Sequence, residues 1–304
     1  MRYQRLDLNL INALRALLTE KNVTRAGELL CVSQSAMSGI LARLREYFED
    51  PLIVPLGRRM ELTPLGESLV DKVNDLILMI DATLGTRPEF DPATTRRHFN
   101  IVASDYAVTV LLHEVLRDLA LCAGGITIEL RQAHRLSYQD LETGEVDFLI
   151  APEWADTPGF SSALLFGDDY SGVVARDNPD VGDTLSLEQY LALGHVACLT
   201  NSGQPMFDLW FSRRHAAARR VEVAFPGFVM LPLLVLSTRR IATLHTRQAM
   251  LACQDESLRR VRLDFELPPF AEMLAWHKYR DHDPGSLWLR ERIMAHARAL
   301  AAPA

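Results

Sequence analysis

The sequence is poor in cysteine and contains no long hydrophobic run. Its 304 residues include four cysteines, Cys31, Cys122, Cys198 and Cys253, which lie far apart and form no CxxC pair. Such spacing fits reduced thiols in a cytosolic protein better than a disulfide framework. No apolar stretch is long enough to span a bilayer, and no charged-then-apolar leader is present. We therefore expect a cytoplasmic protein without a membrane partner.

Motifs of the main catalytic classes are missing as well. The chain contains no GxGxxG, GxxxxGKS/T, GxSxG or HExxH sequence. His277 and His282 stand near Asp281 and Asp283, but most of these residues share one polar loop. That pattern is typical of a solvated turn rather than of converging metal ligands. We expect no catalytic residues, no metal site and no cofactor.

Charge is distributed unevenly along the chain. The formal net charge is −7, which by itself argues against binding to nucleic acid. Residues 1–60, however, hold nine Lys or Arg and six Asp or Glu, a net charge of +3, so the remainder sums to −10. A basic N-terminal part on an acidic body indicates a nucleic-acid contact at one end.

The N-terminal part predicts three helices. Residues 6–22 carry apolar side chains at three- and four-residue spacing, and Asn22 can end this helix. Thr24 suits the N-cap of a short second helix over residues 25–30. After a tight turn, Ser33 caps a third helix that reaches residue 48. The predicted core face of this third helix comprises Ala36, Met37, Ile40, Leu41, Leu44 and Phe48.

Two short helices joined by a tight turn, the second opening with polar side chains, are typical of a helix-turn-helix. The first turn of such a recognition helix enters the DNA major groove. Gln34 can pair with adenine, and Ser35 and Ser38 can reach base edges or phosphates. Arg43 and Arg45 lie off the core face and are expected at the DNA backbone. The alternative is a purely structural helix with a capping serine.

A basic hairpin is expected after the third helix. Residues 52–54 and 60–62 are short apolar runs around a Leu-Gly-Arg-Arg turn, which indicates a wing. Arg58 and Arg59 at its tip suit phosphate or minor-groove contact, although paired arginines also occur in solvated loops. The predicted DNA contacts are Thr24, Ser33, Gln34, Ser35, Ser38, Arg43, Arg45, Arg58 and Arg59.

A long apolar helix connects this head to the rest of the chain. Thr63 and Pro64 mark a helix start, and apolar residues recur at positions 65, 69, 73, 76, 80 and 84. A helix between two domains must bury such a stripe, so we predict a dimer formed by the helices of two copies. The alternative is packing on the body of its own chain. The polar, Pro-containing residues 86–100 predict a hinge.

The body alternates strands and helices, which predicts parallel sheets covered by helices. The extended residues 164–176 lead into a second α/β unit, in which residues 228–238 are predicted as a buried helix. The chain crosses near residue 165 and returns near residue 267. The strands and helices expected in the first unit, in chain order, are 99–104, 107–121, 126–131, 135–143 and 146–151.

Two lobes linked by two crossings leave a cleft between them. Ligands of open α/β sheets bind at the carboxyl ends of strands. Ser104 and Asp105 follow one predicted strand, and Asn201, Ser202 and Gly203 follow another. Their N–H groups and hydroxyls suit a polar group of a small molecule, and the alternative is that both are plain helix caps.

The order of helix-turn-helix, wing, long helix and two-lobed body resembles the LysR-type transcriptional regulators along the whole chain. The stretch LDLNLINALRALLTEKNVTRAGELLCVSQSAMSGILARLREYFEDPLIV and the motif TPLGESL are similar to their DNA-binding head. In the body, RPEFDPATTRRHFNIVASDY, GEVDFLIAPE and WHKYRDHDPGSLWLR resemble the branch that regulates nodulation genes and aromatic-compound degradation.

This resemblance implies an α/β fold with an all-α-plus-wing head and a two-lobed effector domain similar to periplasmic binding proteins. The implied partners are double-stranded promoter DNA, RNA polymerase, a small aromatic effector and further copies of the chain, as a dimer or tetramer. The implied domains are a winged helix-turn-helix over 1–63, a linker helix with its hinge over 64–91, and an effector domain over 92–304. Lobe 1 would comprise 92–165 and 268–304, and lobe 2 would comprise 166–267.

Residues of the family pattern carry over unevenly. Ser33, Gln34 and Ser38 match the pattern Ser-Gln-Pro-x-x-Ser, with Ser35 in place of the usual Pro. The effector contacts implied by the branch fall on Ser104, Val110, Leu111, Asp168, Asn201, Ser202, Gln204, Phe228, Trp276 and His277. The apolar members of this set imply a flat hydrophobic ligand.

The carboxylate of Asp168 would disfavour an anionic ligand and would accept a hydrogen bond from a phenol. We therefore expect a phenolic or hydroquinone effector rather than a benzoate, in a protein that activates transcription. Two other functions stay open from the sequence. One is a redox-sensing regulator that uses Cys198, and the other is a small-molecule binding protein without DNA contact.

Overall fold

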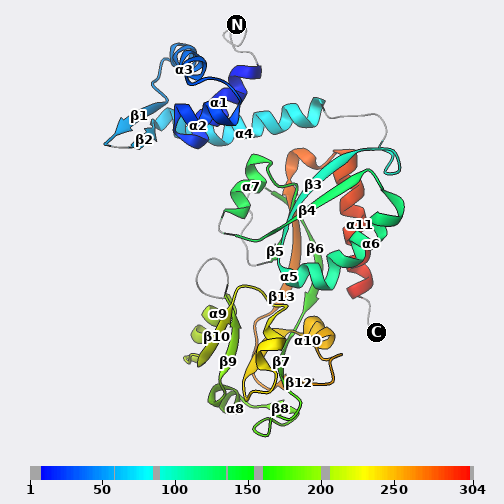
Figure 1. Cartoon of the computed structure of the whole chain (residues 1–304). Coiled ribbons are helices and arrows are strands. Elements are labelled where there is room, and N and C mark those ends of the chain that lie inside the picture. Colours follow the sequence, from blue (N-terminus) through cyan, green and yellow to red (C-terminus); the bar gives the residue numbers. More distant parts are fainter. Residues whose placement is uncertain are drawn as a thin grey trace. The chain divides into compact units, whose positions relative to one another are not determined.

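The computed structural model describes residues 8–57, 59–84, 90–134, 136–153, 160–199 and 206–301 (Figure 1). The chain divides into two compact units, one of Met1–Thr86 with Glu142–Gly144 and one of Arg87–Leu141 with Glu145–Ala304. None of the described helices combines the length and the apolar content that crossing a membrane requires.

The first unit opens with the predicted three helices and hairpin. Strands β1 and β2 pair antiparallel, with Leu56 opposite Arg59. Leu14, Ala26 and Met37 are fully buried and join the three helices in one core. The elements of this unit are α1 (Leu8–Glu20), α2 (Val23–Leu29), α3 (Gln34–Phe48), β1 (Ile53–Leu56), β2 (Arg59–Leu62) and α4 (Pro64–Leu84).

Two local predictions for the head are wrong. Asn22, not Thr24, is the N-cap of α2, because the Asn22 side chain accepts hydrogen bonds from the backbone N–H groups of Thr24 and Arg25. Asn22 therefore starts the second helix instead of ending the first, and Thr24 lies in the first turn. Ala36 is exposed and does not belong to the core face of α3, since the buried stripe begins one residue later, at Met37.

Helix α4 starts where predicted, with the Thr63 hydroxyl accepting from a backbone N–H of the first turn at 3.0 Å. Val73 and Ile77 from its apolar stripe are buried in the core of the head, against α1. Part of the stripe that the sequence assigns to a second copy is thus used within the chain. Leu76 and Met79 remain exposed, at 40% and 46%.

The second unit contains two lobes, each built on one sheet. Lobe 1 has the strand order β4-β3-β5-β13-β6, in which β3 is parallel to β4 and β5 while β13 is antiparallel to β5 and β6. The sheet is mixed rather than parallel because β13 brings the chain back from lobe 2. The elements of lobe 1 are β3 (Arg97–Ala103), α5 (Asp105–Ala107), a π-helical turn (Val108–Leu112), α6 (His113–Cys122), β4 (Ile126–Gln132), α7 (Ser137–Thr143), β5 (Phe148–Pro152), β6 (Phe160–Asp168), β13 (Phe270–His277) and α11 (Pro284–Ala301).

Helices cover both faces of the lobe 1 sheet (Figure 1). Alternate residues of β3 point to opposite faces, so Phe99 and Ile101 pack with Leu289 of α11. Val102 packs on the other face with Leu141 of α7. The carboxyl ends of β3, β4 and β5 are thereby fixed at one edge of the sheet.

Lobe 2 has the strand order β10-β9-β11-β7-β12-β8. The chain enters it after β6 ends at Asp168, slightly later than predicted, and leaves it between Leu263 and Phe270. The elements of lobe 2 are β7 (Tyr170–Ala175), β8 (Thr184–Leu185), α8 (Leu187–Ala192), β9 (His195–Cys198), α9 (Met206–His215), β10 (Val221–Phe225), a 3-10 helix (Leu231–Val235), β11 (Ile241–His245), α10 (Thr246–Ala252) and β12 (Leu258–Leu263).

Residues 228–238 do not form the predicted buried helix. Only Leu231–Val235 are helical, as a 3-10 helix, and Leu233 within it is exposed. Pro232 lacks an N–H for a longer helix, and Ser237 adopts a left-handed conformation with φ of 54° that ends the turn. The apolar content of this stretch serves a loop that packs on lobe 2.

Candidate nucleic-acid interface and ligand cavity

The polar opening of α3 is exposed to solvent. Ser33 is its N-cap: the hydroxyl accepts from the N–H of Ala36 at 3.2 Å and lies 3.0 Å from the hydroxyl of Ser35. The side chains of Gln34 and Ser38 are exposed as well. Capping and exposure therefore coexist, and this turn can present hydroxyl and amide groups to a DNA groove.

The arginines near α3 differ in their surroundings. Arg45 is bound to its own chain, because its Nε and Nη2 donate to the carbonyls of Pro51 and Ile53 at 2.8 and 2.9 Å. This side chain fastens the end of α3 to the start of β1, and its contact with the DNA backbone stays a prediction. Arg43 and Arg59 are exposed, and Arg58 lies outside the described residues.

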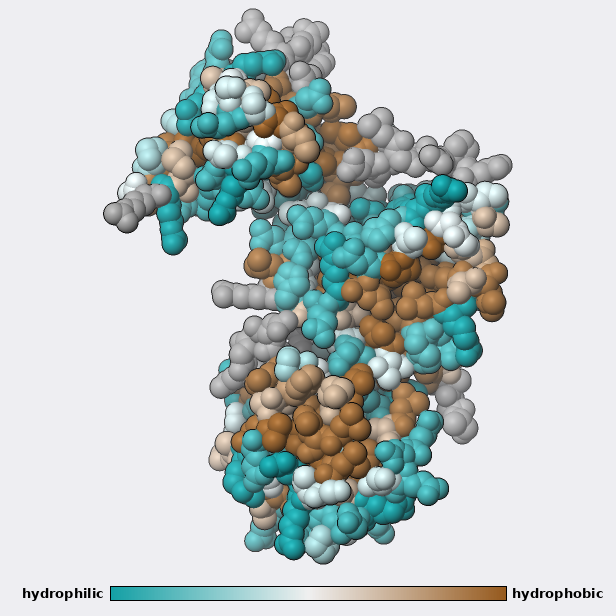
Figure 2. Space-filling model, in the orientation of Figure 1, coloured by the Kyte–Doolittle hydropathy of each residue, from teal (hydrophilic) through white to brown (hydrophobic). Residues whose placement is uncertain are grey.

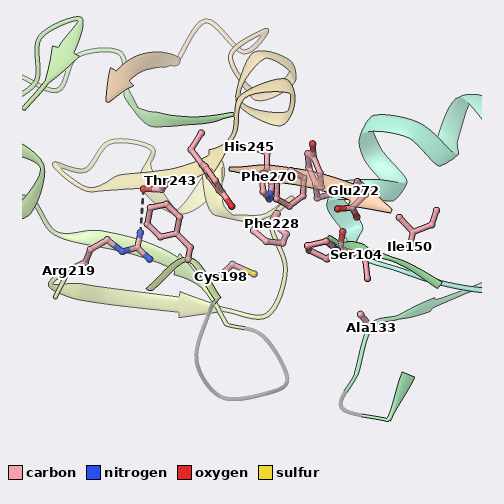
Figure 3. Close-up of a pocket in the computed structure, with 15 residues that line it drawn as sticks. Ser104, Ala133, Ile150, Cys198, Arg219, Phe228, Thr243, His245, Phe270 and Glu272 are labelled. Carbon is pink, nitrogen blue, oxygen red and sulfur yellow. Dashed lines mark hydrogen bonds between the residues drawn. The ribbon is translucent and has the colours of Figure 1, made fainter. Parts of the chain in front are cut away.

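A cavity of about 220 Å³ lies between the two lobes of the second unit (Figure 3). On the lobe 1 side it meets the carboxyl ends of β3, β4 and β5, as expected for an open α/β sheet. Its lining includes Ser104, Tyr106, Ala133, Ile150, Phe270 and Glu272 from lobe 1, and Tyr170, Cys198, Phe207, Arg219, Phe228, Thr243 and His245 from lobe 2.

Aromatic rings form the middle of the cavity. The centroid of the His245 imidazole lies 4.0 Å from that of Phe270 and 4.2 Å from that of Tyr106. Tyr170 and Phe228 follow at 4.7 and 5.4 Å. Because these rings come from both lobes, the cluster joins them, and its flat faces suit a planar aromatic molecule.

Arg219 lies at the lobe 2 end of the cavity, where its groups already have partners. Its side chain is 3% exposed, and Nε donates to Asp208 at 2.6 Å. Its Nη1 donates to the hydroxyls of Tyr190 and Thr243 at 3.2 and 3.4 Å. The positive charge is therefore balanced by Asp208 within the protein.

Glu272 lies at the lobe 1 end of the cavity and, in contrast to Arg219, is not fully hydrogen-bonded. It is 1% exposed, and its Oε2 has no hydrogen-bond partner among the described residues. Burial raises the pKa of this carboxyl from its ordinary value of 4.5 to about 8. Burial also lowers the pKa of His245 to about 3, so the imidazole stays neutral. These two groups are uncharged or nearly so at neutral pH.

Asp105 connects the two lobes beside the cavity. Its Oδ2 accepts hydrogen bonds from the backbone N–H groups of Phe228 and Val229 at 2.7 and 2.9 Å. The preceding Gly227 has φ of 129°, and a Cβ atom there would lie 2.8 Å from the same oxygen. Glycine is therefore required for this close approach, which also places the Phe228 ring in the cavity wall.

The structure brings together only part of the effector contacts implied by the family branch. The Ser104 hydroxyl caps α5 by accepting a hydrogen bond from the N–H of Ala107. Both Ser104 and Phe228 line the cavity. Asn201, Ser202 and Gln204 lie outside the described residues. The described residues of this set that are absent from the cavity lining are Val110, Leu111, Asp168, Trp276 and His277.

Helix and strand directions explain four of these absences. Val110 and Leu111 lie in the π-helical turn, which directs them into the core of lobe 1. Trp276 and His277 lie at the last positions of β13. This strand runs antiparallel to β5, so its first residues, and not its last, reach the edge that forms the cavity. Glu272 near the start of β13 occupies that place instead.

Asp168 accepts a hydrogen bond from a phenol group, but this group is a tyrosine side chain of the protein itself. The Tyr106 hydroxyl donates to its Oδ2 at 2.6 Å, and the N–H of Arg247 donates to the same oxygen at 3.2 Å. Burial raises the pKa of Asp168, and these hydrogen bonds oppose that shift. Asp168 thus positions Tyr106 and does not face a ligand.

The cavity wall also contains Cys198, the residue considered for redox sensing. Burial raises the pKa of its thiol to about 11, which disfavours the reactive thiolate. Sequence reasoning missed Tyr106, Glu272 and His245 as lining residues. One signal was present for Glu272: a carboxylate at an inward position of the apolar strand 270–277 is rare without a function.

The polar loop near the end of the chain has structural roles. Asp281 accepts from the Trp276 indole N–H at 2.6 Å, and Asp283 pairs with Arg97 at 2.6 Å. Within the described part of the chain, no three His, Cys, Asp or Glu side chains are grouped so as to hold a metal ion.

Comparison with known proteins follows the same division of the chain. Residues 8–67 match the family "Bacterial regulatory helix-turn-helix protein, lysR family", and residues 92–298 match "LysR substrate binding domain". Nodulation protein D 1 of Rhizobium tropici is 36% identical over 304 residues, which is 100% of this chain and 99% of the relative. Nodulation protein D 1 of Bradyrhizobium diazoefficiens is 35% identical over 302 residues, covering 99% and 96%.

Solved structures of regulators share the fold. The probable transcriptional regulator PA0477 from Pseudomonas aeruginosa has a TM-score of 0.65 and 28% identity, covering 97% of this chain and 98% of that one. Full-length CbnR in complex with its target DNA has a TM-score of 0.53 at 15% identity, covering 96% and 100%. Both family matches and the full-length relatives agree with the described head and two-lobed unit: the chain belongs to the LysR family of DNA-binding transcriptional regulators and is not an enzyme.

Proposed function

We propose that this regulator activates transcription in response to a small phenolic or hydroquinone effector that binds between its two lobes. The composition of the cavity supports the proposal: its walls are aromatic, and Glu272 offers a buried carboxyl oxygen without a partner among the described residues. In this proposal Glu272, and not Asp168, accepts the hydrogen bond of the effector hydroxyl. An aromatic effector is what the resemblance to regulators of nodulation genes and aromatic-compound degradation implies, and the similarity to proteins named nodulation protein D agrees with that branch.

The proposed DNA contacts divide into two kinds. Gln34, Ser35 and Ser38 read base edges from the exposed first turn of α3, while Arg43 and Arg59 bind phosphates. Thr24, Ser33, Arg45 and Arg58 complete the predicted contact set. The solved complex of the similar regulator CbnR with its target DNA supports duplex DNA as the partner.

A second copy of the chain is part of the proposal. Leu76 and Met79 on α4 are exposed apolar side chains that a second α4 would cover. Figure 2 shows a hydrophobic patch on lobe 2, where Val229, Met230 and Leu233 are exposed, and this patch suits further association into a tetramer. Effector binding in the cytoplasm would then change the placement of the heads on DNA and their contact with RNA polymerase.

Calorimetric titration of the full-length protein tests the effector class. We expect phenols and hydroquinones to bind at least about tenfold more tightly than the corresponding benzoates, because an anion would be buried beside a carboxyl group. Binding of the benzoates alone would refute the proposal.

A further inference from the structure

Most polar groups that line the cavity already have partners inside the protein. Arg219 is paired with Asp208, the Thr243 hydroxyl lies 2.6 Å from that of Tyr190, and the Tyr106 hydroxyl donates to Asp168. Among the completely buried polar atoms of the described lining residues, Oε2 of Glu272 and Nδ1 of His245 are the exceptions.

Both exceptions are too deeply buried to be served by bulk water. Glu272 is 1% exposed and His245 is 4% exposed. Buried polar side chains are nearly always hydrogen-bonded, and one that is not weakens the fold. Both residues line the cavity, so a hydroxyl group that enters it can pair with them once their side chains turn toward it. In Figure 3, Glu272 lies at one end of the labelled group, Arg219 and Thr243 lie at the other, and the rings of His245, Phe270 and Phe228 lie between.

We propose that Glu272 and His245 form the polar subsite of this cavity, and that Glu272 selects a neutral aromatic ligand by binding its hydroxyl group. The inference rests on the proposed function, since it assumes that an aromatic effector enters the cavity, and it adds the atoms that choose among such molecules. The ligand class is a hydroxyarene that carries no charge.

The charge balance of the cavity excludes an arenecarboxylate. Arg219 is the guanidinium in the described lining, and Asp208 already neutralises it. A carboxylate ligand would therefore lose its hydration without gaining a free cation, while lying near the Glu272 carboxyl. A hydroxyl group costs far less to desolvate, and it can both donate to and accept from a carboxyl group.

The same geometry predicts strong discrimination against methyl ethers. The protonated carboxyl group of Glu272 can donate to the oxygen of a methyl ether, but the ether cannot donate in return, so the acceptor oxygen of Glu272 would stay unpaired in the complex. Sites built to bind a hydroxyl reject analogues that lack it, and the loss is about tenfold or more. An aromatic cavity without this subsite would bind a phenol and its methyl ether about equally.

Calorimetry on the full-length protein tests the inference with matched pairs. The probes are hydroquinone with 1,4-dimethoxybenzene, and 4-hydroxybiphenyl with 4-methoxybiphenyl. We expect the wild-type protein to prefer the phenol of at least one pair by about tenfold or more. Glu272→Met, which keeps the bulk and removes both oxygens, should abolish that preference. Glu272→Gln, which keeps an acceptor oxygen, should retain most of it.

Glu153→Gln is the matched control. Glu153 is an exposed residue directly after β5 in the same lobe, so the same change of side chain there should leave the preference intact. Equal binding of phenol and ether by the wild type, or an undiminished preference in Glu272→Met, would overturn the role of Glu272 while leaving an aromatic effector in place. Failure of every phenol and ether to bind would instead refute the proposed aromatic effector itself.

Discussion

Glu272 is a carboxyl group that folding removes from water without supplying a cation. Water hydrates its oxygens in the unfolded chain, whereas aromatic and aliphatic groups surround them in the folded protein. Because this burial disfavours the ionised form, the pKa of the carboxyl rises to about 8. The neighbouring Tyr106 and Tyr170 have pKa values raised further above their ordinary range, and His245 stays neutral. Glu272 is therefore the member of this group that titrates near neutral pH.

This gives a stability prediction with a definite sign. Between its ordinary value of 4.5 and about 8, Glu272 keeps a proton in the folded state that the unfolded chain has released. Its stabilising contribution is fully present below the lower value and is lost as the pH rises through the upper one. Glu272→Gln cannot ionise, so its melting temperature should rise relative to wild type between pH 5 and pH 8.5.

Thermal unfolding at pH 5, 6.5 and 8.5 measures this difference. Other groups near the cavity, including Asp168, titrate in both proteins, so their effects cancel in the comparison. Glu153→Gln is the matched control for the loss of one carboxyl group. A Glu272→Gln difference that is constant across these pH values would show that the Glu272 carboxyl is ionised in the folded protein.

At the residue scale, two of the positions expected to contact an effector lie at the cavity, and their contact with an effector stays a prediction. Ser104 follows a predicted strand and Phe228 was implied by the family, and both line the cavity. Glu272 and His245 were missed because their role depends on which strand edge meets the other lobe. The antiparallel return of β13 decides that, and local periodicity carries no information about it.

At the scale of elements, α3 and the hairpin have different tasks in DNA binding. Gln34 presents an amide from an exposed first turn, whereas Arg59 presents a charge from β2. We expect Gln34→Ala to reduce the ratio of specific to non-specific affinity, because a bidentate base contact is lost at a cost of about 1–3 kcal/mol. Arg59→Ala should weaken binding to all sequences alike and lower the salt dependence.

Mobility-shift titrations at several salt concentrations distinguish the two effects. Arg45→Lys offers a contrast, since Arg45 is bound to the carbonyls of Pro51 and Ile53 and its loss should lower the free energy of unfolding. Identical changes in specificity and salt slope for Gln34→Ala and Arg59→Ala would contradict the assigned roles.

Elements with a clear apolar periodicity were predicted from the sequence, whereas elements whose periodicity is interrupted or absent were not. The apolar spacing of α3 and α4 identified these helices from sequence, and β3 covers most of the predicted strand 99–104. The 3-10 helix at Leu231–Val235 escaped because Pro232 and the left-handed Ser237 interrupt an apolar run that otherwise reads as a helix. The short α10 was not predicted, and its burial depends on packing against β7 and β11.

At the scale of the molecule, direct contacts join the two lobes of the second unit. Asp105 accepts two N–H groups from lobe 2, at Phe228 and Val229, and hydrogen bonds to a charged group contribute about 1.5–3 kcal/mol each. The aromatic cluster around His245 adds apolar contact across the same boundary. The loop that carries Phe228 thus both joins the lobes and forms part of the cavity wall.

Asp105→Ala should loosen this boundary. We expect faster amide hydrogen exchange at Phe228 and Val229 and an effector affinity lower by about tenfold, because part of the binding energy must then order the loop. Asp105→Asn keeps one acceptor oxygen, so its amide exchange rates and effector affinity should lie between those of the wild type and Asp105→Ala. Unchanged exchange at both amides in Asp105→Ala would show that other contacts hold the lobes together.

In the proposed function, a neutral phenol bound between the lobes changes the placement of the heads on DNA. The most direct measurement is a DNase footprint of the full-length protein on a site that it selects from random-sequence DNA, with and without the best-binding phenol. The wild-type footprint should change in extent or in its bend-sensitive cleavages, while Glu272→Met should bind the site and show no change at the same phenol concentration. A wild-type footprint that is identical with the cavity empty and saturated would contradict the claim.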